Sequence, residues 1–414
     1  MIRSIWPSYN DLPNHIPASS QVTTRDFVSY FLFWLLSLPA LWFPVHKIRH
    51  LFTVKAYYAP IAAIAFFAWA IHRANGIGPI VHQPAKAHGG TLGWAFVKGI
   101  MSCLGNFATL IINDPDFSRF SRKPSDSLLS QFLTIPIGFG ITTFIGIIVT
   151  SSSSVIFNKS VWDPLEVLGE FLEGASSGQR FGIFVIATGF ALAQLGSNIA
   201  ANSVSAGTDM AALLPRFINI RRGSYICALI GLAMCPWKLE SSSNQFTTYL
   251  SAYAVFLSSI AGVILADYYF VRKGYLSVKN LYSGHKDAPY YYTLGFSWRA
   301  YAAYISGILI NIVGFVGSVR SVNGPQGVPK GAQYIYNVNY FAGIIVSGLC
   351  YYTLCFVFPV PATSREWCEA PLDENEPRVT YGEAMEDPEY GSGKPSEEDV
   401  AEIPVGSSSS KRGF

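Results

Sequence analysis

Long apolar stretches constrain this chain more than any other feature of its sequence. A helix needs about 20 apolar residues to cross a bilayer. Stretches of about this length lie at residues 27–44, 56–74, 92–113, 128–150, 181–206, 223–237, 247–270, 298–318 and 338–358. Only 13% of the residues are charged, against about 25% in soluble domains. The sequence therefore predicts an all-α polytopic membrane protein with about nine helices, and it excludes a coiled coil, a disulfide scaffold and a disordered chain.

Charge divides the chain into a basic body and an acidic tail. From Arg365 onward there are 13 acidic and 5 basic residues, which leaves 13 acidic and 24 basic residues before it. Lys and Arg, including Lys47, Arg49 and Lys55, are more frequent in one alternate set of loops, which predicts that this set is cytoplasmic. We therefore expect an extracellular segment at 1–26, a membrane body at 27–358 and a disordered cytoplasmic tail at 364–414.

Polar residues within apolar spans are candidates for function, because they are costly to place in a bilayer. Asn113, Asp114 and Asp116 lie at the end of the third span around a proline. This pattern is typical of a helix that breaks or ends early and exposes its backbone groups to a cavity. The alternative for Asp114 and Asp116 is a capped helix end in a solvated loop.

The fifth span carries the densest group of polar residues. Asn198 and Asn202 are four residues apart, so they stack on one helical face. Ala193, Gly196 and Ser197 are small and allow a helix or ligand to approach closely. The two amides offer donors and acceptors to a planar polar heterocycle. The alternative is hydrogen bonding between helices that only holds the bundle together.

Three other features favour structural roles. Asp267 next to Arg272 and Lys273 favours an ion pair at a helix end. Residues 46–50, which read His-Lys-Ile-Arg-His, favour a contact with anionic lipid over a metal site. Residues 174–178 match the letters of a Gly-x-Ser-x-Gly nucleophile elbow but lack its strand–turn–helix setting, so a flexible loop is expected. Because the sequence also contains no P-loop and no zinc-protease motif, we expect no enzyme, no cofactor and no nucleic-acid partner.

Several of these stretches closely resemble the fungal uracil, uridine and allantoin permeases of the nucleobase–cation symporter-1 family, and the similarity runs from Met1 to about Thr363. The segments that carry it are Trp42-Phe43-Pro44-Val45-His46-Lys47-Ile48-Arg49-His50, Asn113-Asp114-Pro115-Asp116-Phe117-Ser118-Arg119-Phe120, Ser197-Asn198-Ile199-Ala200-Ala201-Asn202-Ser203 and Ala266-Asp267-Tyr268-Tyr269. The resemblance implies a leucine-transporter-like fold of twelve spans. On that pattern the chain looks like spans four to twelve, with the first three missing.

The resemblance also assigns roles to single residues. It implies that Asn202 hydrogen-bonds the substrate ring, with Asn198 one turn before it, and that Phe107 is an aromatic lid. Ala193, Gly196 and Ser197 match positions that offer oxygens to sodium in sodium-coupled members. Because Gly196 replaces a hydroxyl residue, proton coupling is expected rather than sodium coupling. Asp209 resembles an acidic coupling or gating position, and a helix cap is its alternative role.

These features predict a secondary transporter of the plasma membrane that imports uracil, a related pyrimidine, uridine or allantoin with protons by alternating access. The alternative is a truncated, membrane-inserted fragment that transports nothing and interacts with full-length copies. A membrane receptor is disfavoured, because the tail is too short and polar for a signalling domain. Lys394 and Lys411 in the tail would be available to ubiquitin and the trafficking machinery.

Overall fold

The computed structural model describes residues 1–43, 45–84, 87–118, 121, 123–238, 243–281, 283–320 and 327–368. Most of the expected tail at 364–414, with Lys394 and Lys411, therefore lies outside the described residues. The described part of the chain is helical and contains no β-strand beyond an isolated bridge between Thr293 and Phe296.

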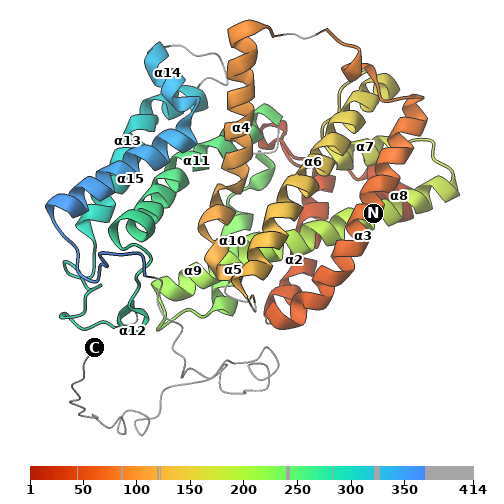
Figure 1. Cartoon of the computed structure of the whole chain (residues 1–414). Coiled ribbons are helices and arrows are strands. Elements are labelled where there is room, and N and C mark those ends of the chain that lie inside the picture. Colours follow the sequence, from red (N-terminus) through yellow and green to blue (C-terminus); the bar gives the residue numbers. More distant parts are fainter. Residues whose placement is uncertain are drawn as a thin grey trace, which may run out of the picture. The chain divides into compact units, whose positions relative to one another are not determined.

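Long helices dominate the structure (Figure 1). The elements are α1 (Ile2–Ile5), η1 (Pro7–Asp11), η2 (Ala18–Ser20), α2 (Thr24–Trp42), α3 (Val45–Ala74), η3 (Pro79–Val81), α4 (Gly89–Ile112), α5 (Asp114–Ser118), α6 (Pro124–Phe157), α7 (Pro164–Phe171), α8 (Ser177–Asn198), η4 (Ile199–Val204), α9 (Ser205–Leu213), α10 (Ile220–Ala233), η5 (Pro236–Lys238), α11 (Ser243–Leu265), η6 (Ala266–Val271), α12 (Val278–Leu281), α13 (Trp298–Arg320), α14 (Lys330–Tyr336) and α15 (Asn339–Val357). The elements η4 and η6 are π-helical.

Among the described residues, 7 segments are long and apolar enough to cross a membrane. They are Lys47–Ala74, Gly89–Ile112, Ser125–Phe157, Ser177–Leu213, Tyr253–Val271, Trp298–Val319 and Asn339–Val357. The other two predicted spans, 27–44 and 223–237, correspond to α2 and α10, which do not meet this criterion. α2 carries Arg25 and Asp26 in its first turn. α10 has 14 residues, which cover only about 21 Å.

Side-chain caps fix where several helices begin. The Thr23 hydroxyl accepts the Asp26 N–H at the start of α2, and the Asn219 amide oxygen accepts the Arg222 N–H at the start of α10. Ser176 and Gln179 form a reciprocal capping box at the start of α8, which satisfies donors that the first helical turn leaves open. This cap falls within residues 174–178, where the letters of a nucleophile elbow occur, so the serine at their centre serves as a helix cap.

The helices α11, α13 and α15 pack through small residues, and α4 lies against α11 (Figure 1). A Cβ on Gly262 would clash with the Ser347 hydroxyl, and one on Gly343 would clash with the Ser258 hydroxyl. Small residues allow such close helix contacts inside a bilayer, where no hydrophobic force drives helices together. Large apolar side chains on the outer faces are exposed, such as Leu128 at 72% on α6, as expected for surfaces in contact with lipid.

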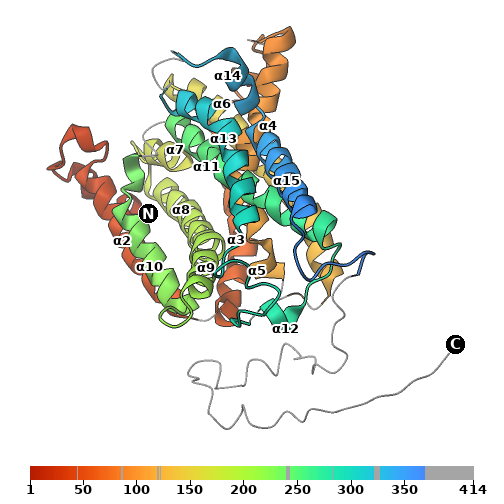
Figure 2. The ribbon, with the colours of Figure 1, turned by 90° about the vertical axis from the view of Figure 1, so that its left-hand side faces the viewer.

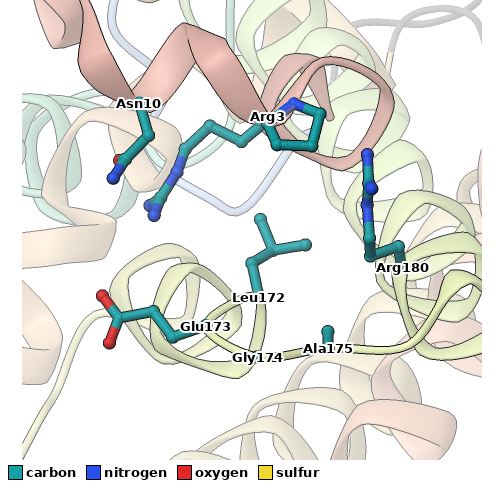
Figure 3. Close-up of a pocket in the computed structure, with 8 residues that line it drawn as sticks. Arg3, Asn10, Leu172, Glu173, Gly174, Ala175 and Arg180 are labelled. Carbon is teal, nitrogen blue, oxygen red and sulfur yellow. The ribbon is translucent and has the colours of Figure 1, made fainter.

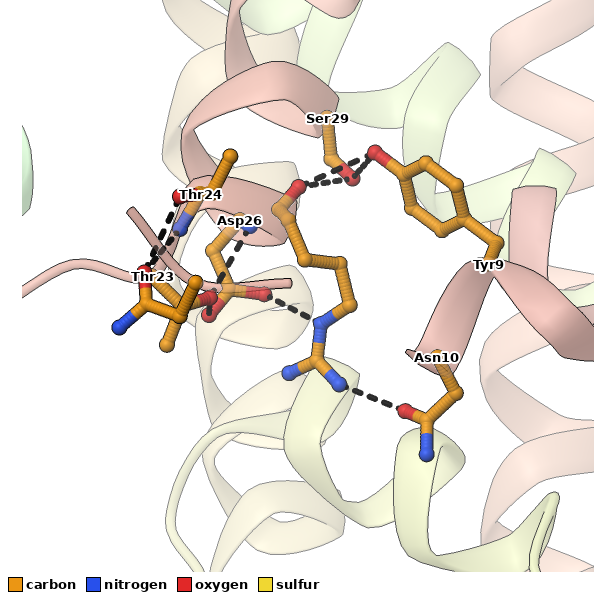
Figure 4. Close-up of polar contacts among 8 residues, drawn as sticks. Tyr9, Asn10, Thr23, Thr24, Asp26 and Ser29 are labelled. Carbon is orange, nitrogen blue, oxygen red and sulfur yellow. Dashed lines mark hydrogen bonds and ion pairs between the residues drawn. The ribbon is translucent and has the colours of Figure 1, made fainter. Parts of the chain in front are cut away.

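The N-terminal segment is held to α2 by a group of polar contacts (Figure 4). The Tyr9 hydroxyl donates to the Arg25 carbonyl oxygen at 3.1 Å, and the Arg25 guanidinium donates to the Asn10 side-chain oxygen at 2.6 Å. Arg25 also pairs with Asp26 at 3.1 Å. The segment around Tyr9 and Asn10 therefore packs on the first long helix. The extracellular location of residues 1–26 remains a prediction.

The predicted ion pair at the end of the seventh span is present. The Arg272 Nε donates to the Asp267 carboxylate at 2.7 Å, and the Arg272 side chain is 1% exposed. Its remaining nitrogens donate to the carbonyl oxygens of Pro361 and Ala362 and to the Tyr292 hydroxyl oxygen. This arginine therefore joins the end of η6 to the chain that follows α15 and to the loop that precedes α13.

Candidate functional site

The candidate site lies where helix α8 changes to the π-helix η4. The segment from Ser177 to Leu213 runs through α8, η4 and α9 as a single span (Figure 2). Asn198 is the last residue of α8, and Asn202 lies within η4. A π-helical turn inside an α-helix widens the backbone and is frequent at functional sites. The sequence predicted the polar residues of this span but not the π-helix.

The two asparagines lie together, as their spacing predicted. The Asn202 Nδ2 donates to the Asn198 Oδ1 at 2.7 Å. Within the described part of the chain, this bond leaves the Asn202 Oδ1 and the Asn198 Nδ2 without another hydrogen bond. The pair therefore offers one acceptor and one donor, which complements the donor and acceptor of a cyclic amide.

Lys55 reaches helix α8 from α3. Its Nζ donates to the Ser197 hydroxyl oxygen at 2.9 Å, next to the two asparagines. The lysine stem passes over Gly196, where a Cβ would lie 2.6 Å from the Lys55 Cδ and 3.6 Å from the Phe52 ring. Gly196 thus leaves the space that the lysine stem occupies, and the ammonium group lies beside the positions predicted to bind a cation.

The prediction that Lys47, Arg49 and Lys55 lie in a loop is wrong, because all three lie within helix α3. Helix α3 begins at Val45, and the apolar segment Lys47–Ala74 includes Lys55 about three turns from the helix start. A lysine within a long apolar helical stretch was the available signal. It was missed because the span was taken to start at residue 56, one residue beyond the lysine.

The end of α4 contacts the same span further along the chain. The Asn113 Nδ2 donates to the Ser205 hydroxyl oxygen at 2.7 Å and to the Asp209 carboxylate at 3.2 Å. Helix α4 stops at Ile112 and α5 starts at Asp114, so the predicted break in the third span is present. The Asp114 carboxylate accepts the Gln131 Nε2 at 2.7 Å. Asp209 therefore faces a partner from a different helix, which a purely local helix cap would not do.

The remaining predicted residues occupy different surroundings. Phe107 lies on α4 with its ring 4.3 Å from the Phe139 ring of α6 in an edge-to-face arrangement. Ala193 lies on α8, about one turn before Ser197. The lid role of Phe107 and the cation-binding role of Ala193 stay predictions. The described residues contain no cluster of metal-ligating side chains.

A separate cavity lies between the N-terminal segment and the connection from α7 to α8 (Figure 3). It has a volume of about 220 Å³ and is lined by Arg3, Pro7, Asn10, Leu172, Glu173, Gly174, Ala175 and Arg180. None of the predicted site residues lines it. The Arg180 guanidinium there donates to the carbonyl oxygens of Ser4 and Ile5, so it fastens the N-terminal segment to α8.

Apolar spans, an interrupted helix and polar side chains inside a span define a polytopic helical membrane protein with a candidate binding site within the bilayer. The chain belongs to the family described as permeases for cytosine/purines, uracil, thiamine and allantoin, whose pattern matches residues 1–343. The resemblance to nucleobase–cation symporters stated on sequence grounds is thereby confirmed.

Named relatives agree with this membership. The chain is 47% identical to an allantoin permease and 46% identical to a uracil permease, both of Saccharomyces cerevisiae. These matches cover 88% and 87% of the chain and 58% of each relative. A permease of Schizosaccharomyces pombe without an assigned substrate is 50% identical over 94% of the chain and 65% of its own length. The chain thus spans about three fifths of the length of the curated relatives it matches.

Solved structures confirm the expected fold. The chain superposes on Mhp1 in its inward-facing conformation with a TM-score of 0.56 at 20% identity, which covers 84% of this chain and 69% of that one. The closed form of Mhp1, a nucleobase–cation symporter-1 transporter with bromovinylhydantoin bound, gives the same TM-score at 18% identity, over 81% and 68%. The leucine-transporter-like fold expected from the resemblance is therefore observed. At this identity the likeness concerns the fold alone.

Proposed function

We propose that this chain acts as a secondary transporter that imports uracil, uridine, a related pyrimidine or allantoin across the plasma membrane by alternating access. The observation that carries the proposal is the Asn198–Asn202 pair at the junction of α8 and η4. Among the described residues, this pair leaves one acceptor and one donor without another hydrogen bond. The allantoin and uracil permeases that the chain resembles support this class of substrate. A ring amide that bonds both groups would be oriented by two hydrogen bonds.

The same proposal assigns proton coupling to Lys55. Its ammonium group bonds Ser197, at one of the positions that the resemblance connects with a cation. A lysine that loses and regains its proton changes the local charge by one unit, as the arrival and departure of an ion would. Gly196 supports this assignment, because it provides the space for the lysine stem.

Alternating access requires helices whose contacts can separate and re-form. The bonds from Asn113 to Ser205 and Asp209 join α4 and α9 next to the site. We propose that they hold one entrance closed in this conformation, which gives Asp209 the gating role. We place this entrance on the cytoplasmic face of the membrane, because the loops around it carry the excess of basic residues. We also propose a cytoplasmic C-terminus, where the trafficking machinery would reach Lys394 and Lys411.

The test is uptake of radiolabelled uracil, uridine and allantoin in cells that lack their own permeases. The chain should take up at least one of them, and Asn202→Ala should lower uptake by at least tenfold at equal surface expression. Thr208→Ala is the matched control, because among the described residues the Thr208 hydroxyl bonds only the Val204 carbonyl oxygen of its own span. No uptake of any of these solutes by the unmodified chain would refute the proposal, and the chain would then be a membrane-inserted protein without transport activity.

A further inference from the structure

Two helix corners lie side by side at the end of the molecule where α2 turns into α3 and α9 turns into α10 (Figure 2). Helices α2 and α10 run antiparallel in contact along their length. The Trp34 Nε1 donates to the Ala228 carbonyl oxygen at 3.0 Å, and the Tyr225 hydroxyl donates to the Leu38 carbonyl oxygen at 3.0 Å. At the corner itself, the Arg221 guanidinium lies 4.8 Å from the centre of the Trp42 ring.

The two corners carry a group of exposed cationic side chains. They are Lys47, Arg49, Arg216, Arg221 and Arg222. None of them forms an ion pair with a carboxylate among the residues that the structure describes. The carboxylate of α9, Asp209, accepts a hydrogen bond from Asn113 instead. The corners therefore hold five positive charges that the described part of the protein does not neutralise.

Exposed apolar side chains adjoin these cations. Trp42 is 59% exposed, Phe43 53% and Phe217 65%, and Leu213 at the end of α9 is 77% exposed. Tryptophan side chains such as Trp42 gather where the headgroups of a bilayer meet its acyl chains. The Arg216 guanidinium lies 5.8 Å from the centre of the Phe217 ring, so charge and apolar surface occur on neighbouring residues. We call the five cations with Trp42, Phe43, Leu213 and Phe217 the corner patch.

We propose that the corner patch is a binding site for an anionic phospholipid of the leaflet that this end of the protein faces. The cations would contact the phosphate and the acidic headgroup, while the exposed rings and Leu213 contact the acyl chains. Basic clusters at a membrane surface attract anionic lipids in this way. The apolar half of the patch favours a lipid over free phosphate, because free phosphate gains nothing from contact with apolar side chains. The binding site joins two corners that are about 170 residues apart in the sequence.

Native mass spectrometry of the full chain, released from phosphatidylcholine nanodiscs with and without phosphatidylserine, tests this inference. The unmodified chain should retain phosphatidylserine in preference to phosphatidylcholine. The double variant Lys47→Gln/Arg49→Gln should bind it roughly 25-fold more weakly, at about fivefold for each cation removed. The matched control is Lys98→Gln/Lys330→Gln, which removes two exposed lysines outside the patch and should retain phosphatidylserine as the unmodified chain does.

The outcomes separate the alternatives. Equal retention by both double variants would overturn the assignment of the site. Displacement of the retained lipid by millimolar inorganic phosphate would overturn its lipid specificity and leave only a general anion site. A third variant, Arg221→Lys, keeps the charge and should retain the lipid, so a loss of binding there would show that charge at the corner does not decide the affinity. Elution of each variant as a single peak establishes that it is folded.

Discussion

The ion pair between Arg272 and Asp267 makes a quantitative prediction about stability. The guanidinium is 1% exposed and bonds the Asp267 carboxylate, two backbone carbonyl oxygens and the Tyr292 hydroxyl oxygen. Removal of one partner from a buried ion pair costs about 3–5 kcal/mol. Asp267 is 26% exposed and keeps a 2.7 Å hydrogen bond from the Tyr351 hydroxyl. The lower figure, about 3 kcal/mol, therefore applies to Arg272→Met.

The assay is the thermal unfolding of the purified protein in detergent, followed by loss of the monodisperse peak. At about 2 °C per kcal/mol for a large chain, Arg272→Met should lower the apparent transition temperature by about 6 °C. Lys273→Met is the control, because within the described part of the protein the Lys273 ammonium group is bonded only to the Arg365 carbonyl oxygen. That variant should shift the transition by no more than about 2 °C. If the two substitutions lowered the transition temperature equally, the hydrogen bonds and ion pair of Arg272 would not be a principal source of stability.

Three further substitutions test other parts of the structure. Burial raises the pKa of Asp163, which caps α7. The charged carboxylate is therefore disfavoured in the folded state, and the free energy of unfolding falls as the pH rises through that pKa. Asp163→Asn should keep the cap and remove this pH dependence, which melting temperatures measured across the pH range would show. Gly207→Ala places a Cβ 2.5 Å from the Ile220 carbonyl oxygen. This substitution should lower the free energy of unfolding by about 1–3 kcal/mol. An unchanged melting temperature would contradict the tight contact of α9 with α10. Gly196→Ala should displace Lys55 and lower proton-driven uptake at least tenfold, whereas Gly231→Ala, which meets open space, should leave uptake unchanged.

Hydropathy was sufficient to locate the long helices, because a helix that crosses a bilayer needs about 20 predominantly apolar residues. It was less reliable at the boundaries. The predicted span at 223–237 ends early, since α10 stops at Ala233, before Pro236. The spacing of Asn198 and Asn202 predicted their contact, because residues four apart share a helical face.

Other features of the site depend on tertiary structure. The bonds from Asn113 to Ser205 and Asp209 join residues about 90 positions apart, and no local pattern indicates which distant helix a polar side chain will meet. The contact of Lys55 with Ser197 could not be predicted locally either, because it depends on the packing of α3 against α8. The π-helix η4 is likewise a backbone adjustment that the letters of the sequence do not mark.

Uptake into proteoliposomes under an imposed inward proton gradient tests directly whether this protein is a proton-coupled importer. We expect the reconstituted chain to accumulate uracil, uridine or allantoin above the external concentration, and the Asn202→Ala variant not to do so. We also expect that Lys55→Arg, whose guanidinium stays protonated, exchanges solute across the membrane without accumulating it. Accumulation by Asn202→Ala at the rate of the unmodified chain, or no transport of these solutes by the unmodified chain, would contradict the account.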